Sequence, residues 1–314
     1  MRIGKRGVGG IVLGGLGVAL GLLMVYTLAF EGAARRGFRT VAAGRVEVPV
    51  FFLERSEWRI FARGVSACTE PARGLGRMID EDDDLLIVET PKNHRRVRFT
   101  WHGLRGERQA RDEVRKAIEA DGPIAVIGAS NTVTTLALAR GLHDLAADHK
   151  PLLLVPWATS VELLGEYPGR TFRFCSNNRR LAGLLVDCLK ARPGRAGPRR
   201  VEMVVDRLDP YSVDLAECFR REIAGAYPQA EVAPEVDETA TSPGPRFSGR
   251  GPLPTEGDLR HARAIWREVS QDPKRETLVV LPLQNDPARR MLLALNAAGP
   301  GRHEAERMPL TVVC

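Results

Sequence analysis

Residues 123–142, PIAVIGASNTVTTLALARGL, read as a strand, a turn and a helix, and this unit decides the fold. The apolar run at 124–127 is typical of a buried parallel strand, and leucines recur on one helical face after the turn. Between them lie three residues that favour helix N-termini, Ser130, Asn131 and Thr132. In open α/β sheets such turns follow the carboxyl ends of strands, where free N–H groups bind anions. The turn is therefore a candidate site for a carboxylate or a phosphate, although the same residues also suit plain helix caps.

Strand-like and helix-like segments alternate along most of the remaining chain, which predicts an α/β fold with parallel, doubly wound sheets. The expected strands span residues 46–53, 97–101, 124–127, 151–156, 171–174, 201–205, 277–281 and 310–313. The expected helices lie at 58–68, 107–120, 133–142, 179–190, 212–226, 261–270 and 288–298. A chain of 314 residues is long enough for two such lobes, which we expect at 40–174 and 175–314.

Three local features interrupt this alternation. Pro49 lies inside the first expected strand, where proline favours an edge position or a bend. The acidic run DEDDD at 80–84 predicts an exposed loop, and it lacks the ligand spacing of a calcium site. Residues 238–257 are dense in Pro, Gly, Ser and Thr, which predicts a flexible insertion in the second lobe.

The N-terminal segment differs from the rest of the chain. Residues 7–30 carry no charge and are long enough to span a bilayer. Because the segment exceeds the apolar core of a signal peptide and lacks a good cleavage site, an uncleaved signal anchor is favoured over a cleaved signal peptide. Arg2, Lys5 and Arg6 precede it, which favours a cytoplasmic N-terminus. We therefore expect residues 1–39 to form a cytoplasmic stub, one transmembrane helix in the cytoplasmic (inner) membrane and a linker to an extracytoplasmic domain.

Composition and motif spacing exclude several classes of function. The net charge of +7 comes from basic residues scattered among 39 acidic ones, without the basic face that nucleic-acid binding needs. The five cysteines show no C-x-x-C or Cys/His spacing, so no metal site is expected. The six histidines pair with no cysteine or carboxylate at the spacing of a triad or ligand set. We expect neither catalysis nor a bound cofactor.

Four segments resemble, in order and spacing, the type I periplasmic substrate-binding proteins. They are IAVIGASNTVTTLALA at 124–139, VPWATSVEL at 155–163, TFRF at 171–174 and VEMVVDRLDPYSVDLA at 201–216. The most similar group is the leucine/isoleucine/valine-binding proteins of branched-chain amino-acid ABC importers, together with related receptor domains. The resemblance covers the chain from about residue 46 onward and implies two lobes with a ligand cleft between them. Since the last expected strand ends the chain, we expect a C-terminally short version of this fold.

The resemblance also implies which residues hold a ligand. In the family, hydroxyl and backbone N–H groups of the first lobe bind the α-carboxylate, and Thr132, Ala158 and Thr159 match those positions. Tyr211 matches an aromatic residue of the second lobe, and Asn285 matches a second one more loosely. The complete set of expected ligand-binding residues is Ser130, Asn131, Thr132, Trp157, Ala158, Thr159, Tyr211 and Asn285.

Two departures from the family concern the ligand itself. Trp157 replaces a small residue, so its indole would fill part of an amino-acid pocket, stack on a planar ligand, or serve only as a packed aromatic. The acidic partner of a ligand ammonium is missing from its usual place. Asp206 or Asp209 would replace it, or would cap a helix.

Two functional classes follow from these observations. The first is a membrane-anchored solute-binding protein that captures an amino acid or a similar small carboxylate for ABC permease subunits or for a sensor. The second is an interaction protein that keeps the fold and has lost the ligand. A fragment of a longer receptor is a third interpretation.

Overall fold

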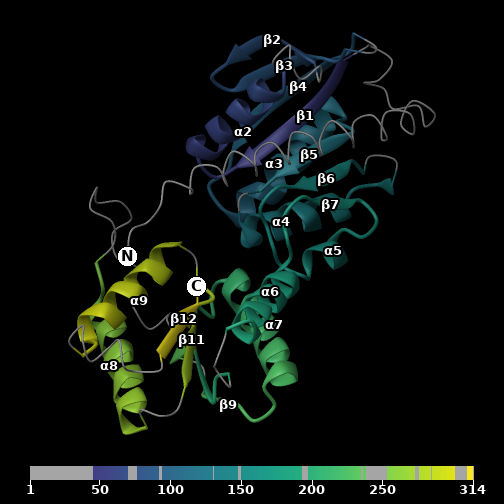
Figure 1. Cartoon of the computed structure of the whole chain (residues 1–314). Helices are drawn as coiled ribbons and strands as arrows, with labels where there is room; N and C mark the ends of the chain where they lie inside the picture. Colours follow the sequence, from purple (N-terminus) through teal and green to yellow (C-terminus); the bar gives the residue numbers. More distant parts are fainter. Residues whose placement is uncertain are drawn as a thin grey trace. The chain divides into compact units, whose positions relative to one another are not determined.

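The computed structural model describes residues 45–69, 76–91, 94–129, 131–147, 150–192, 197–234, 236–237, 253–272, 276–283, 285–300 and 310–313. The chain divides between Ser176 and Asn177 into two compact units, and each contains its own sheet (Figure 1). The expected transmembrane segment 7–30 and residues 238–252 of the expected insertion lie outside the described residues. Within the described ranges, no helix combines the length and the apolar character needed to cross a bilayer.

The first unit is organised around a seven-stranded sheet with the order β2-β3-β4-β1-β5-β6-β7. Its strands are β1 (Arg45–Phe52), β2 (Arg77–Asp82), β3 (Leu85–Glu89), β4 (Arg96–Gly103), β5 (Ala125–Gly128), β6 (Leu152–Val155) and β7 (Thr171–Arg173). Its helices are α2 (Arg55–Cys68), α3 (Glu107–Asp121), α4 (Thr132–His143) and α5 (Leu163–Glu166). The pairs from β4 to β7 are parallel, as the alternation of strands and helices predicts.

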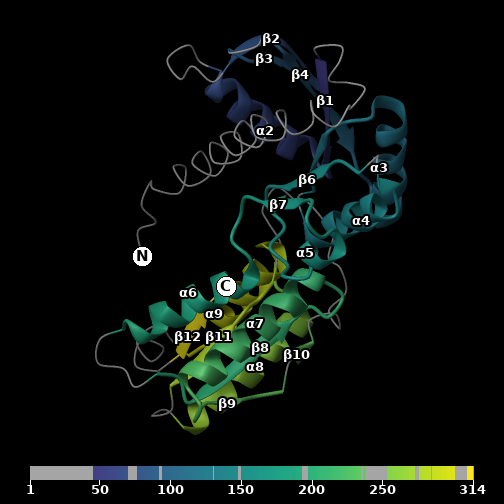
Figure 2. The same cartoon turned by 90° about the vertical axis from the view of Figure 1, so that its right-hand side faces the viewer.

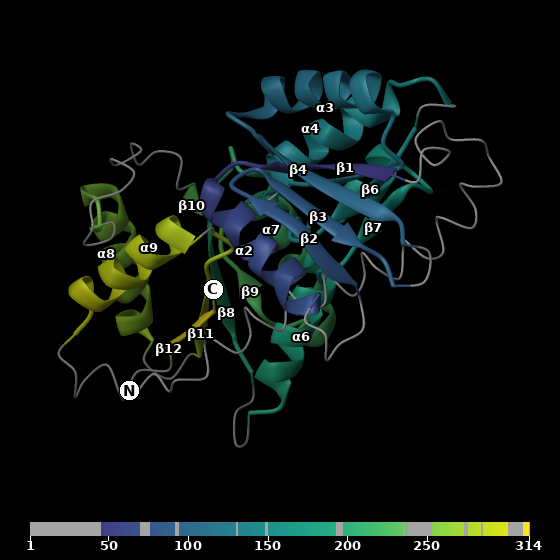
Figure 3. The same cartoon turned by 90° about the horizontal axis from the view of Figure 1, so that it is seen from above.

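Helices cover both faces of this sheet, with α3 and α4 on one side and α2 on the other (Figure 3). Side chains alternate between the two faces of a strand, so neighbouring residues of β1 pack against helices on opposite faces of the sheet. Phe51 packs with the α3 and α4 side and Phe52 with Trp58 and Phe61 of α2, and both phenylalanines are fully buried. A strand buried on two faces reads as a continuous apolar run.

The acidic run at 80–84 is exposed, as expected, but only Asp83 and Asp84 form a turn, so the expectation of a loop throughout is wrong. Asp80–Asp82 belong to β2, which pairs antiparallel with β3 and forms the edge of the sheet. The side chains of this strand are mostly exposed, and charged residues suit an edge strand because they oppose pairing with other chains. The sequence pattern missed the hairpin because β2 has no apolar face of its own.

Pro49 lies in an interior strand, so of the two expected alternatives, an edge position or a bend, the edge position is wrong. It is paired with Thr100 of β4, whereas the ladder between β1 and β5 contains only Val50 and Phe51. Proline has no backbone N–H to donate. Because Pro49 precedes the first residue that pairs with β5, the ladder to β5 requires no N–H from it.

The second unit has a five-stranded parallel sheet with the order β10-β8-β11-β12, and β9 also pairs with β8. Its strands are β8 (Arg200–Val205), β9 (Glu231–Val232), β10 (Val236–Asp237), β11 (Thr277–Val280) and β12 (Leu310–Val313). Its helices are α6 (Asn178–Lys190), α7 (Pro210–Ala226), α8 (Glu256–Gln271) and α9 (Asn285–Ala298). The helices pack in two pairs, α6 with α7 and α8 with α9, beside the strands (Figure 2).

Helix α8 begins five residues before its expected start at His261. Thr255 and Asp258 form a capping box, in which each side chain accepts from the other residue's backbone N–H, at 3.1 and 2.7 Å. Glu256 and Gly257, the last residues of the expected insertion, therefore belong to the helix.

Candidate functional site

The expected first-lobe residues follow two adjacent strands. β5 and β6 are parallel neighbours, with Ala125 opposite Leu152 in the ladder. The turn after β5 leads into α4, and the turn after β6 contains Trp157, Ala158 and Thr159. Because the strands are parallel, both turns leave the same edge of the sheet. This edge is where open α/β sheets hold their ligands.

Most polar groups in the turn after β5 are used to build it. The Asn131 side chain accepts from the Thr134 N–H at 2.9 Å and caps α4. The Thr135 hydroxyl accepts from the Ala129 N–H at 3.0 Å and donates to the Asn131 carbonyl at 2.6 Å. Thr132 is only 3% exposed and takes no part in these side-chain hydrogen bonds. Ser130 lies outside the described residues.

The turn after β6 is held differently, through its backbone carbonyls. Arg173 of β7 donates to the Thr159 carbonyl at 3.1 Å and also to the Ser160 carbonyl. The Cys175 thiol donates to the Ala158 carbonyl at 3.3 Å, and burial raises the pKa of this thiol, so it stays protonated as a donor. The Thr159 hydroxyl is buried and has no hydrogen-bond partner in the described part of the chain. The turn thus has a fixed backbone and an unused hydroxyl.

Trp157 is half-buried and packs against the core on the α2 side of the sheet. Its ring lies 5.2 Å from the ring of Phe52, at an interplanar angle of 43°. This contact agrees with the interpretation of Trp157 as a packed aromatic.

The expected residues of the second unit lie at helix N-termini. Tyr211 is the second residue of α7, and its N–H donates to the Asp209 carboxylate at 3.1 Å. The Asp206 carboxylate accepts from the Leu208 N–H at 2.9 Å. The Asp209 carboxylate therefore caps α7, as the capping interpretation predicts, whereas the Asp206 carboxylate stabilises the loop before this helix. Asn285 is the first residue of α9, and its side chain is not among those described.

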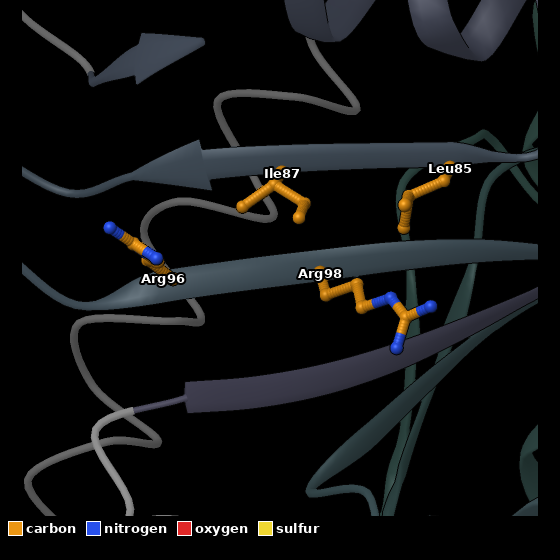
Figure 4. Close-up of a pocket in the computed structure, with 4 residues that line it drawn as sticks. All are labelled: Leu85, Ile87, Arg96 and Arg98. Carbon is orange, nitrogen blue, oxygen red and sulfur yellow. The ribbon is translucent and has the colours of Figure 1, made fainter. Parts of the chain in front are cut away.

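A pocket of about 260 Å³ lies on β3 and β4, away from β5 and β6. Leu85 and Ile87 line it from β3, and Arg96 and Arg98 from β4 (Figure 4). An acidic residue offsets one of the two arginines, because a carboxylate oxygen of Glu47 lies 3.7 Å from the Arg98 guanidinium. This pocket includes none of the expected ligand-binding residues. In the described residues, no group of three or more His, Cys, Asp or Glu side chains is arranged to bind a metal ion.

Sequence reasoning missed the role of Arg173 in the turn after β6. The residue belongs to the TFRF segment, yet an arginine in an edge strand reads only as an exposed charge. Its position at the carboxyl end of the strand adjacent to β6 is the signal that points to the turn. Recognising that signal requires the strand order.

Comparison with known proteins identifies the fold through structure alone. No protein-family model matches the chain, and no curated protein matches it. An ABC transporter substrate-binding protein from Desulfitobacterium hafniense, in complex with Leu, matches with 14% identity and a TM-score of 0.58, over 85% of this chain and 66% of that one. A solute-binding protein from R. palustris, in complex with 4-hydroxybenzoate, matches with 15% identity and a TM-score of 0.58, over 86% and 61%. A leucine-, isoleucine-, valine-, threonine- and alanine-binding protein from Brucella ovis matches with 13% identity and a TM-score of 0.58, over 85% and 60%.

These matches confirm the resemblance at the level of the fold, which is the two-sheet α/β fold of type I periplasmic binding proteins. The chain spans less than two thirds of the length of each of these three proteins. Their names describe substrate-binding, solute-binding and amino-acid-binding proteins.

Proposed function

We propose that this chain is an extracytoplasmic solute-binding protein that captures an amino acid or a similar small carboxylate for ABC-type import or for sensing. The ligand carboxylate binds at the carboxyl edge of the first sheet, between the turns that carry Thr132 and Thr159. ABC permease subunits are the proposed partners in import. Residues 7–30 anchor the protein in the cytoplasmic membrane.

The buried hydroxyl of Thr159 is the observation that carries the proposal. A buried hydroxyl without a partner costs about 1–3 kcal/mol, so a protein retains one where something else satisfies it. A carboxylate is a suitable acceptor, and a hydrogen bond to a charged group contributes about 1.5–3 kcal/mol. Thr132, at the N-terminus of the neighbouring helix, adds a second hydroxyl and the favourable end of the helix dipole.

A ligand screen followed by two variants tests this site. We would screen L-amino acids and small carboxylates by thermal shift and measure affinity by calorimetry. Thr132→Val and Thr159→Val keep the side-chain shape and remove the hydroxyl, and each should weaken binding by about 10- to 150-fold. Thr100→Val is the matched control, because Thr100 lies on β4 outside both turns. Unchanged affinity in both variants would remove the site assignment.

The membrane anchor requires its own experiment. A long uncharged segment should keep the protein in the membrane fraction during extraction with high salt. A soluble product with an N-terminus near residues 32–36 would instead indicate a cleaved signal peptide.

An interaction protein without a ligand is the second candidate. The packing of Trp157 on Phe52 favours it, because the resemblance implies a small residue at this position, and an indole there would fill part of an amino-acid pocket. A screen in which no amino acid or small carboxylate raises the melting temperature would select this candidate.

A further inference from the structure

We propose that Trp157 makes the site select planar aromatic carboxylates over aliphatic amino acids. This inference rests on the proposed function, since it names the ligand class of the same site. It draws on three features of the turns after β5 and β6: an indole fixed in place, an unused hydroxyl in the same turn, and the absence of an acidic residue.

The indole is held in position before any ligand arrives. Its ring packs on Phe52, which is fully buried and in turn contacts Phe61 at a ring distance of 6.0 Å and an angle of 68°. A side chain fixed in this way loses little conformational freedom on binding, so its contacts contribute more fully to affinity. Trp157 is only half-buried, so part of the residue stays accessible, and an indole offers an apolar, polarisable surface that favours a flat π-system.

The polar group of the ligand is specified by the next two residues. Ala158 is buried and packs on the α3 and α4 side, opposite to the side on which Trp157 packs. Thr159 follows with its buried, unpartnered hydroxyl, and its backbone is fixed by Arg173. An aromatic surface and a hydroxyl donor within three residues match a ligand in which a carboxylate is attached directly to a ring.

An α-ammonium group finds no carboxylate partner in these turns. Residues 128–132, GASNT, and 156–160, PWATS, contain no acidic side chain. At other strand ends, Glu54 accepts from the Ser56 hydroxyl at 3.0 Å, and Asp206 and Asp209 accept from backbone N–H groups. A carboxylate that lacks an ammonium group requires no such partner, which favours aromatic acids over amino acids.

Two variants of one residue test the inference on the full chain in detergent, with benzoate, 4-hydroxybenzoate and L-leucine as probes. The native protein should bind at least one aromatic acid about tenfold more tightly than L-leucine. Trp157→Leu keeps apolar volume without a ring and should abolish that preference. Trp157→Phe keeps the ring and should retain the preference, while the change in tryptophan fluorescence on binding disappears. Melting temperatures of both variants provide the control for folding.

The outcomes separate this inference from the proposed function. L-leucine binding that is tighter than binding of both aromatic acids, and that Trp157→Leu leaves unchanged, would overturn the inference and leave a solute-binding protein. Failure of all three probes and of the wider screen would overturn both. If Trp157→Leu does not fold, the fluorescence of the native protein decides. A change in tryptophan fluorescence on addition of an aromatic acid supports ring stacking on Trp157 if the change disappears in Trp157→Phe while the affinity is retained. No change in the native protein contradicts ring stacking.

Discussion

The turns after β5 and β8 lie in different units and are built by the same hydrogen bonds. In each, the first N–H after the strand donates to a buried hydroxyl six residues later, from Ala129 to Thr135 at 3.0 Å and from Asp206 to Ser212 at 2.9 Å. In each, a polar side chain before the helix accepts from a backbone N–H of the first turn. Asn131 fills that role in the first unit and Asp209 in the second. These polar residues are therefore parts of the turn.

The turn after β6 contrasts with both of them. Here the carbonyls are held by Arg173 and Cys175, and the Thr159 hydroxyl has no partner in the part of the chain that the structure describes. The comparison teaches that polar residues after a strand do not by themselves indicate a ligand. The useful signal is a buried polar group that the local structure leaves unused.

The largest effect on stability should come from removing the buried hydroxyl that each of the two capped turns contains. Thr135→Val leaves the buried Ala129 N–H without an acceptor and should lower the free energy of unfolding by about 1–3 kcal/mol. Ser212→Ala should have an effect of similar size in the second unit, because Ser212 is also fully buried. Urea unfolding followed by circular dichroism measures both. A neutral Thr135→Val variant would contradict the common construction of the turns.

The helix caps should have the next largest effect. Asn131→Ala and Asp209→Ala each remove one acceptor at a helix N-terminus and should cost about 1 kcal/mol in unfolding free energy. Substituting Ser in place of Ala should recover most of the loss, since Ser is also a good cap. If neither Ser variant recovers stability, the two side chains act through contacts other than the cap.

Thr159→Val should change the free energy of unfolding in the opposite direction. Replacing an unpartnered buried hydroxyl by a methyl group should leave the free energy of unfolding unchanged or raise it by up to about 1 kcal/mol. The same substitution weakens ligand binding in our proposal, so stability and affinity would change independently. A loss of stability comparable to that of Thr135→Val would show that Thr159 is structural and would remove the contrast between the turns.

The smallest effect concerns the ion pair between α4 and α5, the helices that follow the two turns of the first unit. Arg140 donates to Glu166 at 2.7 Å, and this hydrogen bond holds the pKa of the Glu166 carboxyl below its usual value. A lowered pKa stabilises the folded state above the usual glutamate pKa, and this contribution disappears as the pH falls through the folded value. Because both side chains are partly exposed, Glu166→Gln should cost only about 0.5 kcal/mol at pH 7. Its melting temperature should converge with that of the native protein in acid, and a constant difference would exclude the ion pair as the cause.

Much of the fold follows from local sequence. Apolar runs predict the buried parallel strands β5, β6, β8 and β11, because a strand covered on both faces has no polar side. Residues such as Asn131 predict helix starts, since a cap depends only on its own next few residues. The expected positions of Thr132 and Thr159 after neighbouring strands agree with the observed ladder between β5 and β6.

What the tertiary structure decided depends on partners that are distant in the sequence. Pro49 fits in an interior strand only because the ladder to β5 begins at Val50, and the sequence around Pro49 does not contain that register. The Arg173 side chain becomes useful because β7 lies next to β6, so that its guanidinium reaches two carbonyls more than a dozen residues earlier. The buried Thr159 hydroxyl is a result of the same packing. Composition and periodicity show that a threonine is present, but only the surrounding atoms determine whether its hydroxyl already has a partner.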